Sequence, residues 1–202
     1  MSVAGRLEAM ATASQLADAE VYRGMLVAAN SQMNLVGPST LEDFWVRHFL
    51  DSAQLASLAP GARSWADLGT GAGLPGLILG ILLKGNVNAQ VHLVESQAKK
   101  CRFLSEVAQA LDLPVKVHNA RAESLRLTVD VVTARACAPL KKLLGYADPY
   151  FRRGALGLFL KGEGVDLEIA DARSAWQFKS EVTPSASDER GRVLWISELR
   201  HV

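Results

Sequence analysis

The chain has 202 residues, of which 49% are hydrophobic and 21% charged, values typical of a folded soluble protein that exclude disorder as its general state. Its formal net charge of +1 excludes a uniformly basic surface, so any polyanionic partner has to be bound by a local patch. The longest strongly apolar run, Leu74 to Leu83, is about half the ~20 residues of a membrane-spanning helix. We therefore expect no membrane segment and, because the first residues lack the pattern of a secretion signal, a cytoplasmic location.

The first 60 residues predict an N-terminal helical extension. Apolar residues recur there at helical spacing, which indicates two or three helices. The Gly-Pro pair at positions 37 and 38 predicts a break, after which Ser39 or Thr40 is expected to cap a helix that runs to about Ser57.

From residue 61 onward, short β-branched or apolar runs alternate with helical stretches, which is typical of parallel βαβ units. The candidate strands are Ser64–Leu68, Gln90–Glu95, Val115–His118, Val129–Thr133 and Leu156–Leu160, and the candidate helices are Leu74–Leu83, Ala98–Ala110, Leu140–Tyr150 and Gly164–Phe178. The segments Lys179–Pro184 and Arg192–Leu199 are expected to add an antiparallel pair. We predict an α/β fold with a doubly wound, mostly parallel, seven-stranded sheet in residues 61–202.

A glycine-rich loop between the first strand and the next helix is the most distinctive local feature. Three of its glycines fit the dinucleotide-binding pattern G-x-G-x-x-G, which leaves a nicotinamide-type cofactor open. These are Gly71, Gly73 and Gly76. However, Asp67 precedes Gly69 by two residues, and the resulting acidic-x-Gly-x-Gly-x-Gly string resembles the first motif of S-adenosyl-L-methionine methyltransferases. A carboxylate at this position suits a cationic methionyl group and would repel a pyrophosphate, so we favour S-adenosyl-L-methionine as cofactor.

Two further acids follow the next two strands. Glu95 ends the second strand, where its carboxylate could accept the hydroxyls of a ribose or, alternatively, cap the following helix. Glu123 follows the third strand and could accept the amino group of an adenine. Because the carboxyl ends of parallel strands form the ligand crevice of such sheets, Asp67, Glu95 and Glu123 are expected to lie around one pocket.

The end of the fourth strand narrows the chemistry. It lacks the Asp/Asn-Pro-Pro-Tyr/Phe motif of enzymes that methylate exocyclic amines, and Cys137 lacks the Pro-Cys order of cytosine C5 enzymes. We therefore interpret Cys137 as a packed thiol, and no Cys/His cluster predicts a metal. The remaining acceptors are atoms that attack a methyl group without prior deprotonation, such as guanine N7, while small-molecule O- or N-methylation stays open.

Five strings in order resemble the GidB family, also called RsmG, over roughly residues 30 to 165. They are His48-Phe49-Leu50-Asp51-Ser52, Asp67 to Gly76, Arg121-Ala122-Glu123, Ala134-Arg135-Ala136 and Leu160-Lys161-Gly162. The resemblance implies a methyltransferase domain in residues 61–202 that uses S-adenosyl-L-methionine to methylate guanine N7 in 16S rRNA of the small ribosomal subunit. It also implies that Gly69, Leu74, Ala122, Glu123 and Arg135 line the cofactor site.

The predicted site combines these arguments. Arg135 is the candidate catalytic residue, holding either the cofactor carboxylate or the guanine edge through its planar fork. The candidate cofactor-binding residues are Asp67, Gly69, Gly71, Gly73, Leu74, Glu95, Ala122, Glu123 and Arg135. Lys161 and basic pairs such as Lys99 and Lys100 could contact phosphates of the RNA. The sequence indicates no protein partner. Two alternative functions remain, a small-molecule methyltransferase and a nucleotide-dependent oxidoreductase or binding module.

Overall fold

The computed structural model describes residues 2–202, with the side chains of Pro38 and Ser39 excepted. The strands are β1 (Ser64–Leu68), β2 (Gln90–Glu95), β3 (Val115–Asn119), β4 (Val131–Arg135), β5 (Leu156–Lys161), β6 (Trp176–Pro184) and β7 (Arg192–His201). The helices are α1 (Val3–Met10), α2 (Ala13–Met33), α3 (Pro38–Glu42), the π-helix η1 (Phe44–Leu50), α4 (Asp51–Leu58), α5 (Gly76–Leu83), α6 (Ala98–Ala110), the 3₁₀ turn η2 (Ala122–Ser124), α7 (Leu140–Phe151) and α8 (Val165–Ala172). Within residues 2–202 every helix is too short or too polar to cross a membrane.

The seven strands form one sheet in the order β3-β2-β1-β4-β5-β7-β6. Strands β1 to β5 are parallel, and β7 runs antiparallel to both β5 and β6. This confirms the predicted doubly wound sheet with an added antiparallel pair. The order reverses direction beside β1, so the carboxyl ends of β1, β2 and β4 meet at the point where ligands bind in such sheets.

The expected long helix over residues 164–178 is wrong in its second half. Helix α8 ends at Ala172, and β6 begins at Trp176. Buried Trp176 and Phe178 alternate with exposed Gln177 and Lys179, which is the two-residue period of a strand with one buried face. The Trp176 indole also donates a hydrogen bond to the Lys141 carbonyl at 3.1 Å.

Strand β4 begins two residues later than predicted. The preceding residue, Asp130, accepts hydrogen bonds from the backbone N–H groups of Arg63 and Ser64, both at 2.8 Å. Its carboxylate therefore ties the start of β4 to the start of β1. As a consequence β4 extends to Arg135, which becomes the last residue of the strand.

The N-terminal extension contains more helical elements than the two or three expected. Helix α3 starts at Pro38 with Gly37 as its N-cap, so the expected capping by Ser39 or Thr40 is wrong. The Thr40 hydroxyl instead donates to the Gly37 carbonyl at 2.7 Å. Helix α4 ends at Leu58, close to the predicted position.

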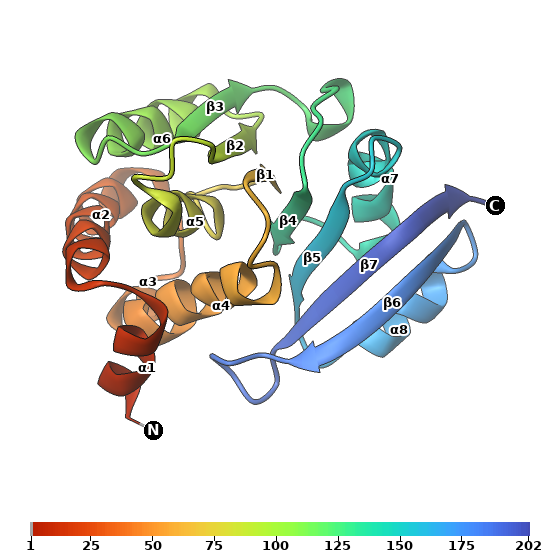
Figure 1. The fold of residues 1–202 in the computed structure, drawn as a ribbon, viewed down its shortest axis with the longest axis horizontal. Helices are drawn as coiled ribbons and strands as arrows, with labels where there is room; N and C mark the ends of the chain where they lie inside the picture. The colour runs from red at the N-terminus through yellow and green to blue at the C-terminus, as the bar shows by residue number, and fades with distance from the viewer. Residues whose placement is uncertain (1) are drawn as a thin grey trace.

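Helices cover both faces of the sheet (Figure 1). One layer contains α5 and α6 with α1, α2 and α4 beside them, and the other contains α7 and α8. Tyr22 and Phe44 of the extension lie in the same buried cluster as Leu77 of α5 and Leu93 of β2. The predicted boundary at residue 60 stays a prediction, but the two segments share one hydrophobic core.

A pair of histidines on β2 and β3 provides a pH-dependent contact. His92 Nδ1 lies 2.9 Å from His118 Nε2, and burial, followed by the charges of His118 and Lys116, lowers the pKa of His92 to about 4. At pH values between about 4 and 6.5, His92 is protonated in the unfolded chain but neutral in the folded chain. The free energy of unfolding therefore falls as the pH falls through this range. Urea unfolding measures this effect. Between pH 7 and pH 5, we expect the free energy of unfolding of the wild type to fall by about 1 kcal/mol more than that of His92→Gln, after allowance for solvent screening. Equal losses would contradict this assignment.

Candidate active site

Asp67 lies inside the protein at the end of β1. Its side chain has no exposed surface. One oxygen accepts hydrogen bonds from the Thr70 hydroxyl and, at 2.9 Å, from the Gly76 N–H, and the other accepts from the Thr133 hydroxyl at 3.2 Å. Burial raises the pKa of Asp67 to about 6, against the effect of these hydrogen bonds. Asp67 thus has no exposed surface and holds both ends of the glycine-rich loop through Thr70 and Gly76, and its part in binding the cofactor stays a prediction.

The loop exposes backbone at its first two glycines and packs tightly at its end. Gly69 is exposed with φ +63°, and Gly71 is half-buried with φ +58°. A Cβ at Gly76 would lie 2.1 Å from the Leu93 side chain, so this position admits only glycine. Gly73 and Leu74 are buried, and their predicted place in the cofactor site stays a prediction.

The N-terminal extension supports this loop from the other side. The Tyr22 hydroxyl of α2 donates to the Ala72 carbonyl at 2.9 Å. Burial raises the pKa of Tyr22, so the hydroxyl remains a donor at neutral pH. The loop is thus fixed by β1 below it and by α2 beside it.

Glu95 contacts both the start of α6 and the glycine-rich loop, while its expected role in binding ribose hydroxyls stays a prediction. Its carboxylate accepts hydrogen bonds from the Gln97 N–H at 2.9 Å, ahead of α6, and from the Gly71 N–H at 3.2 Å. Each carboxylate oxygen can accept more than one hydrogen bond, so the group retains capacity for a hydroxyl ligand. Glu123 is exposed on η2, next to buried Ala122, whose carbonyl accepts from the Tyr150 hydroxyl at 3.1 Å.

The charges of the three predicted acids act on one thiol. Burial and then the negative charges of Asp67, Glu95 and Glu123 raise the pKa of Cys137. Asp67 and Glu95 are both buried and both contact the glycine-rich loop, and the position of exposed Glu123 at the same pocket stays a prediction. A thiol with a raised pKa is a poor nucleophile, which supports the interpretation of Cys137 as a packed side chain.

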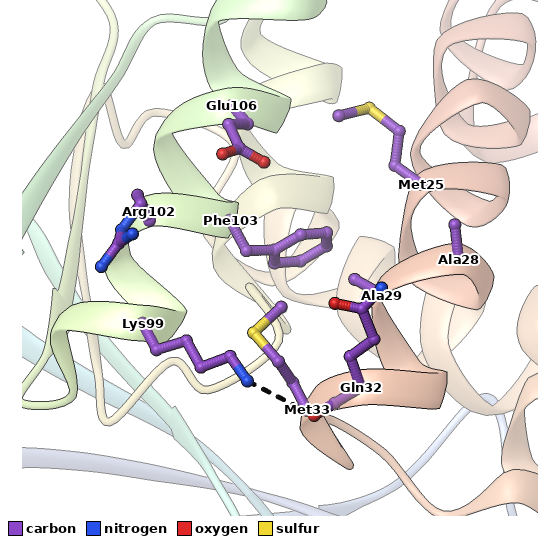
Figure 2. A pocket seen from close by; sticks show the side chains of 9 residues that line it. All are labelled: Met25, Ala28, Ala29, Gln32, Met33, Lys99, Arg102, Phe103 and Glu106. Atoms are coloured by element: carbon purple, nitrogen blue, oxygen red, sulfur yellow. Dashed lines mark hydrogen bonds between the residues drawn. The ribbon is translucent and has the colours of Figure 1, made fainter.

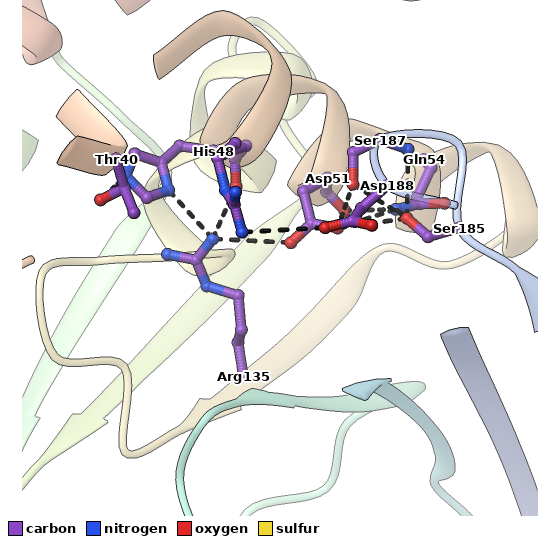
Figure 3. Close-up of polar contacts among 9 residues, drawn as sticks. Thr40, His48, Asp51, Gln54, Arg135, Ser185, Ser187 and Asp188 are labelled. Carbon is purple, nitrogen blue, oxygen red and sulfur yellow. Dashed lines mark hydrogen bonds and ion pairs between the residues drawn. The ribbon is translucent and has the colours of Figure 1, made fainter. Parts of the chain in front are cut away.

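Arg135 extends from the end of β4 to the N-terminal extension (Figure 3). Its Nη1 donates to the Arg47 carbonyl at 2.9 Å and to His48 Nδ1 at 3.0 Å, and lies 3.5 Å from a carboxylate oxygen of Asp51. All three contacts use the same nitrogen, so within the described residues Nη2 and Nε are left for a ligand. Arg135 lines the same cleft as Cys137, and a Cβ at Gly69 would lie 2.6 Å from Cys137 Sγ, so this cleft borders the glycine-rich loop.

His48 is held neutral between Arg135 and Thr40. Because the guanidinium can only donate, His48 Nδ1 accepts, and its Nε2 carries the proton toward the Thr40 hydroxyl at 3.1 Å. Burial, followed by the charge of Arg135, lowers the pKa of His48 to about 4. The π-helix η1 presents this imidazole and the Arg47 carbonyl on the same side, toward Arg135.

Arg135 and Cys137 line a cleft of about 1240 Å³ at the carboxyl ends of β4 and β5. Three acids of the cleft lie in ion pairs with three of its cations: Arg135 with Asp51 at 3.5 Å, Lys161 with Glu168 at 2.7 Å and Arg47 with Asp188 at 3.7 Å. The remaining charged residues of its wall are Glu163 and Arg190. Its charges thus balance, which suits an uncharged planar group better than a chain of phosphates.

Lys161 does not serve as an exposed phosphate contact. Its side chain is 9% exposed, and its ammonium donates to Glu168 and, at 3.1 Å, to the Ala138 carbonyl. Another basic candidate, Lys99, lies together with Arg102 at a separate groove of about 490 Å³ between α2 and α6. Figure 2 shows Phe103 and Met33 pointing into this groove.

The sheet order, the glycine-rich loop after β1 and the acids after β2 and β3 define a Rossmann-like methyltransferase. A solved S-adenosylmethionine-dependent methyltransferase from Aquifex aeolicus has the same fold, with a TM-score of 0.58 at 17% identity over 81% of this chain and 94% of that one. The chain belongs to the GidB family, rRNA small subunit methyltransferase G, whose family model matches residues 15–192.

Curated relatives support this membership along nearly the whole chain. The ribosomal RNA small subunit methyltransferase G of Caulobacter vibrioides is 59% identical over 95% of this chain and 89% of its own length. That of Methylorubrum populi is 45% identical over 91% and 88%. The protein is thus an S-adenosyl-L-methionine-dependent methyltransferase of 16S rRNA that acts, by family, on guanine N7. This decides against the oxidoreductase, binding-module and small-molecule alternatives.

The residues around the loop fit this cofactor. Gly69 and Gly71 offer backbone without side chains at the mouth of the loop, and Glu95 offers a nearly buried carboxylate beside them. Arg135 supplies a cation with unused donors for a carboxylate. The roles of Gly69, Glu95, Glu123 and Arg135 in binding it stay predictions.

Alanine at Gly69 is expected to weaken cofactor binding more than alanine at Gly71. Both positions have positive φ and share that strain, but only at Gly69 would the Cβ lie 2.6 Å from Cys137 Sγ; at Gly71 the nearest atom is 3.8 Å away. In calorimetry with S-adenosylhomocysteine we expect roughly a 10-fold larger loss for Gly69→Ala. Adding Cys137→Ala to Gly69→Ala should restore part of the lost affinity. Adding it to Gly71→Ala should restore none. Equal effects at the two glycines would refute this account.

Proposed function

We propose that this protein methylates N7 of a guanine in 16S rRNA, with the cofactor on the loop 69–71 and the guanine in the cleft beside Arg135. The observation that carries the proposal is the adjacency of loop and cleft: a Cβ at Gly69 would meet Cys137, and Cys137 lines the cleft. A group on the loop and a group in the cleft are thereby neighbours.

The chain needs only to bind and orient its two reactants. When bound, S-adenosyl-L-methionine supplies a methyl group on a cationic sulfur. Guanine N7 attacks with a lone pair in the plane of the ring and loses no proton, so no general base is required. This agrees with the state of His48 in the cleft wall, since both of its ring nitrogens are already in hydrogen bonds. Positioning then accounts for the rate enhancement.

We further propose that Arg135 binds the cofactor carboxylate through Nη2 and Nε. Its proximity to the loop and the family resemblance support this choice over the guanine edge. Glu95 binds the ribose hydroxyls, and Glu123 with Ala122 binds the adenine. We propose 16S rRNA, either free or within the small ribosomal subunit, as the partner and the cytoplasm as the place of the reaction.

The test uses purified protein, methyl-labelled S-adenosyl-L-methionine and two substrates, naked 16S rRNA and small subunits, both from a strain that lacks the modification. We expect label in the RNA, at a single guanine that becomes sensitive to reduction and aniline cleavage, as N7-methylguanine does. Label at other atoms, or only in small metabolites, would overturn the proposal. The comparison of naked RNA with subunits shows which of the two forms the protein methylates.

A further inference from the structure

The hairpin between β6 and β7 forms part of the cleft wall. Strand β7 runs antiparallel to β5, and its first residue, Arg192, pairs with Lys161 at the end of β5. The hairpin tip, residues 185–191, therefore lies at the same edge of the sheet as the carboxyl ends of the parallel strands. Ser187, Asp188, Arg190 and Gly191 of this tip line the cleft.

Asp51, the first residue of α4, holds this tip. Its Oδ1 accepts hydrogen bonds from the Ser187 hydroxyl at 2.7 Å and from the Ser185 hydroxyl at 3.3 Å. The neighbouring Gln54, which is buried, donates to Ser185 Oγ at 3.0 Å and accepts from the Ala186 N–H at 2.8 Å. Residues more than 130 positions apart in the sequence thus form one polar cluster (Figure 3).

The second oxygen of the same carboxylate faces Arg135. Asp51 Oδ2 lies 3.5 Å from Nη1, the nitrogen that also contacts His48 and the Arg47 carbonyl. One side chain with an exposed fraction of 16% therefore contacts the cation beside the cofactor loop and the hairpin that borders the cleft. None of the other acids of the cleft wall bridges these two parts within the described residues.

We propose that Asp51 is a positioning residue for methyl transfer that couples the orientation of Arg135 to the position of the β6–β7 hairpin. Through Oδ2 it orients the guanidinium for the cofactor, and through Oδ1 it fixes the wall against which the RNA base docks. The inference rests on the proposed placement of cofactor and guanine on the two sides of Arg135. A partly buried carboxylate with two unlike sets of donors has this effect because moving either set changes the geometry of the other.

The two halves of the coupling can be separated by substitution. Asp51→Asn keeps one oxygen for the serine hydroxyls but presents an amide N–H₂ to the Arg135 donor. The double variant Ser185→Ala/Ser187→Ala removes the hydroxyl contacts between the hairpin and Asp51 Oδ1 and leaves Asp51 and Arg135 unchanged. The Gln54–Ala186 hydrogen bond and the Arg47–Asp188 ion pair remain. Asp18→Asn is the matched control, because Asp18 of α2 forms a partly exposed ion pair with Lys84 at 2.9 Å, and neither residue lines the cleft.

We expect Asp51→Asn to weaken S-adenosylhomocysteine binding about 5-fold in calorimetry, and the double serine variant to raise KM for the RNA substrate about 5-fold while cofactor affinity stays at the wild-type value. Arg135→Lys should also cost less in the Asp51→Asn background than in the wild type. Asp18→Asn should match the wild type in affinity and KM. The inference fails if the wild type is active and both Asp51→Asn and the double serine variant keep the wild-type cofactor affinity and KM. The proposed function fails if the wild type leaves guanine N7 unmethylated.

Thermal unfolding separates these effects from a general loss of folding. If Asp51→Asn is too unstable to measure, the serine variant carries the test alone, and an unchanged KM in that variant overturns the proposal. An additive Arg135→Lys effect in the two backgrounds overturns the coupling to Arg135.

Discussion

Replacing Asp67 by alanine is expected to lower the free energy of unfolding by about 2–4 kcal/mol and to weaken S-adenosylhomocysteine binding at least ~10-fold. The carboxylate accepts three hydrogen bonds at a fully buried position. Without it, the Gly76 N–H is left buried and unpaired, and the loop between Gly69 and Gly76 loses the group that holds both its ends. Urea unfolding and calorimetry measure the two effects.

Asp67→Asn serves as the control, since its amide oxygen can still accept from Gly76 or Thr70, and it should cost less than alanine. The pH dependence has a defined sign. The folded pKa of about 6 lies above the ordinary value of 3.8, so the wild type is stabilised relative to Asp67→Asn at low pH. That advantage, about 2–3 kcal/mol by the size of the shift, is lost as the pH rises through 6. If the Asp67→Ala variant bound the cofactor with wild-type affinity, this would contradict the role of Asp67 in holding the loop.

The second large effect is expected for Arg135→Lys, which should reduce kcat/KM by about 100-fold and cofactor affinity by about 10-fold. Lysine keeps the charge but lacks the planar fork. In Arg135, Nη1 contacts His48, the Arg47 carbonyl and Asp51, while Nη2 and Nε can offer two parallel donors to a carboxylate. Lysine has a single nitrogen and cannot do both. Calorimetry and single-turnover methyl transfer check the two numbers.

The control for this variant is Arg23→Lys, at an exposed ion pair of α2 with Glu20, which should leave both parameters unchanged. An Arg135→Lys enzyme that binds S-adenosylhomocysteine normally but transfers methyl groups slowly would move Arg135 from the cofactor carboxylate to the guanine edge.

The residues that sequence reasoning missed belong to the cleft wall. Asp51 belongs to one of the sequence motifs that resemble the family, yet nothing in its sequence neighbourhood predicts a contact with Ser185 and Ser187. Gln54, inside a helix of ordinary composition, gave no signal at all. Such contacts depend on where an edge hairpin ends, and this is set by the pairing of β7 with β5.

The sequence by itself determined the fold class, because period and turn residues are local properties, and the resemblance of its motifs to a known family implied the cofactor. The strand order came from the tertiary structure. Asp67 shows the limit of that reasoning. Its position in the motif was identified from the sequence, but its complete burial was not, since burial depends on packing against Thr70, Thr133 and the start of α5. Likewise, only the tertiary structure decided that Lys161 is paired and that Arg135 contacts the N-terminal extension. Side-chain orientation and ion pairing depend on elements distant in sequence, which local pattern does not specify.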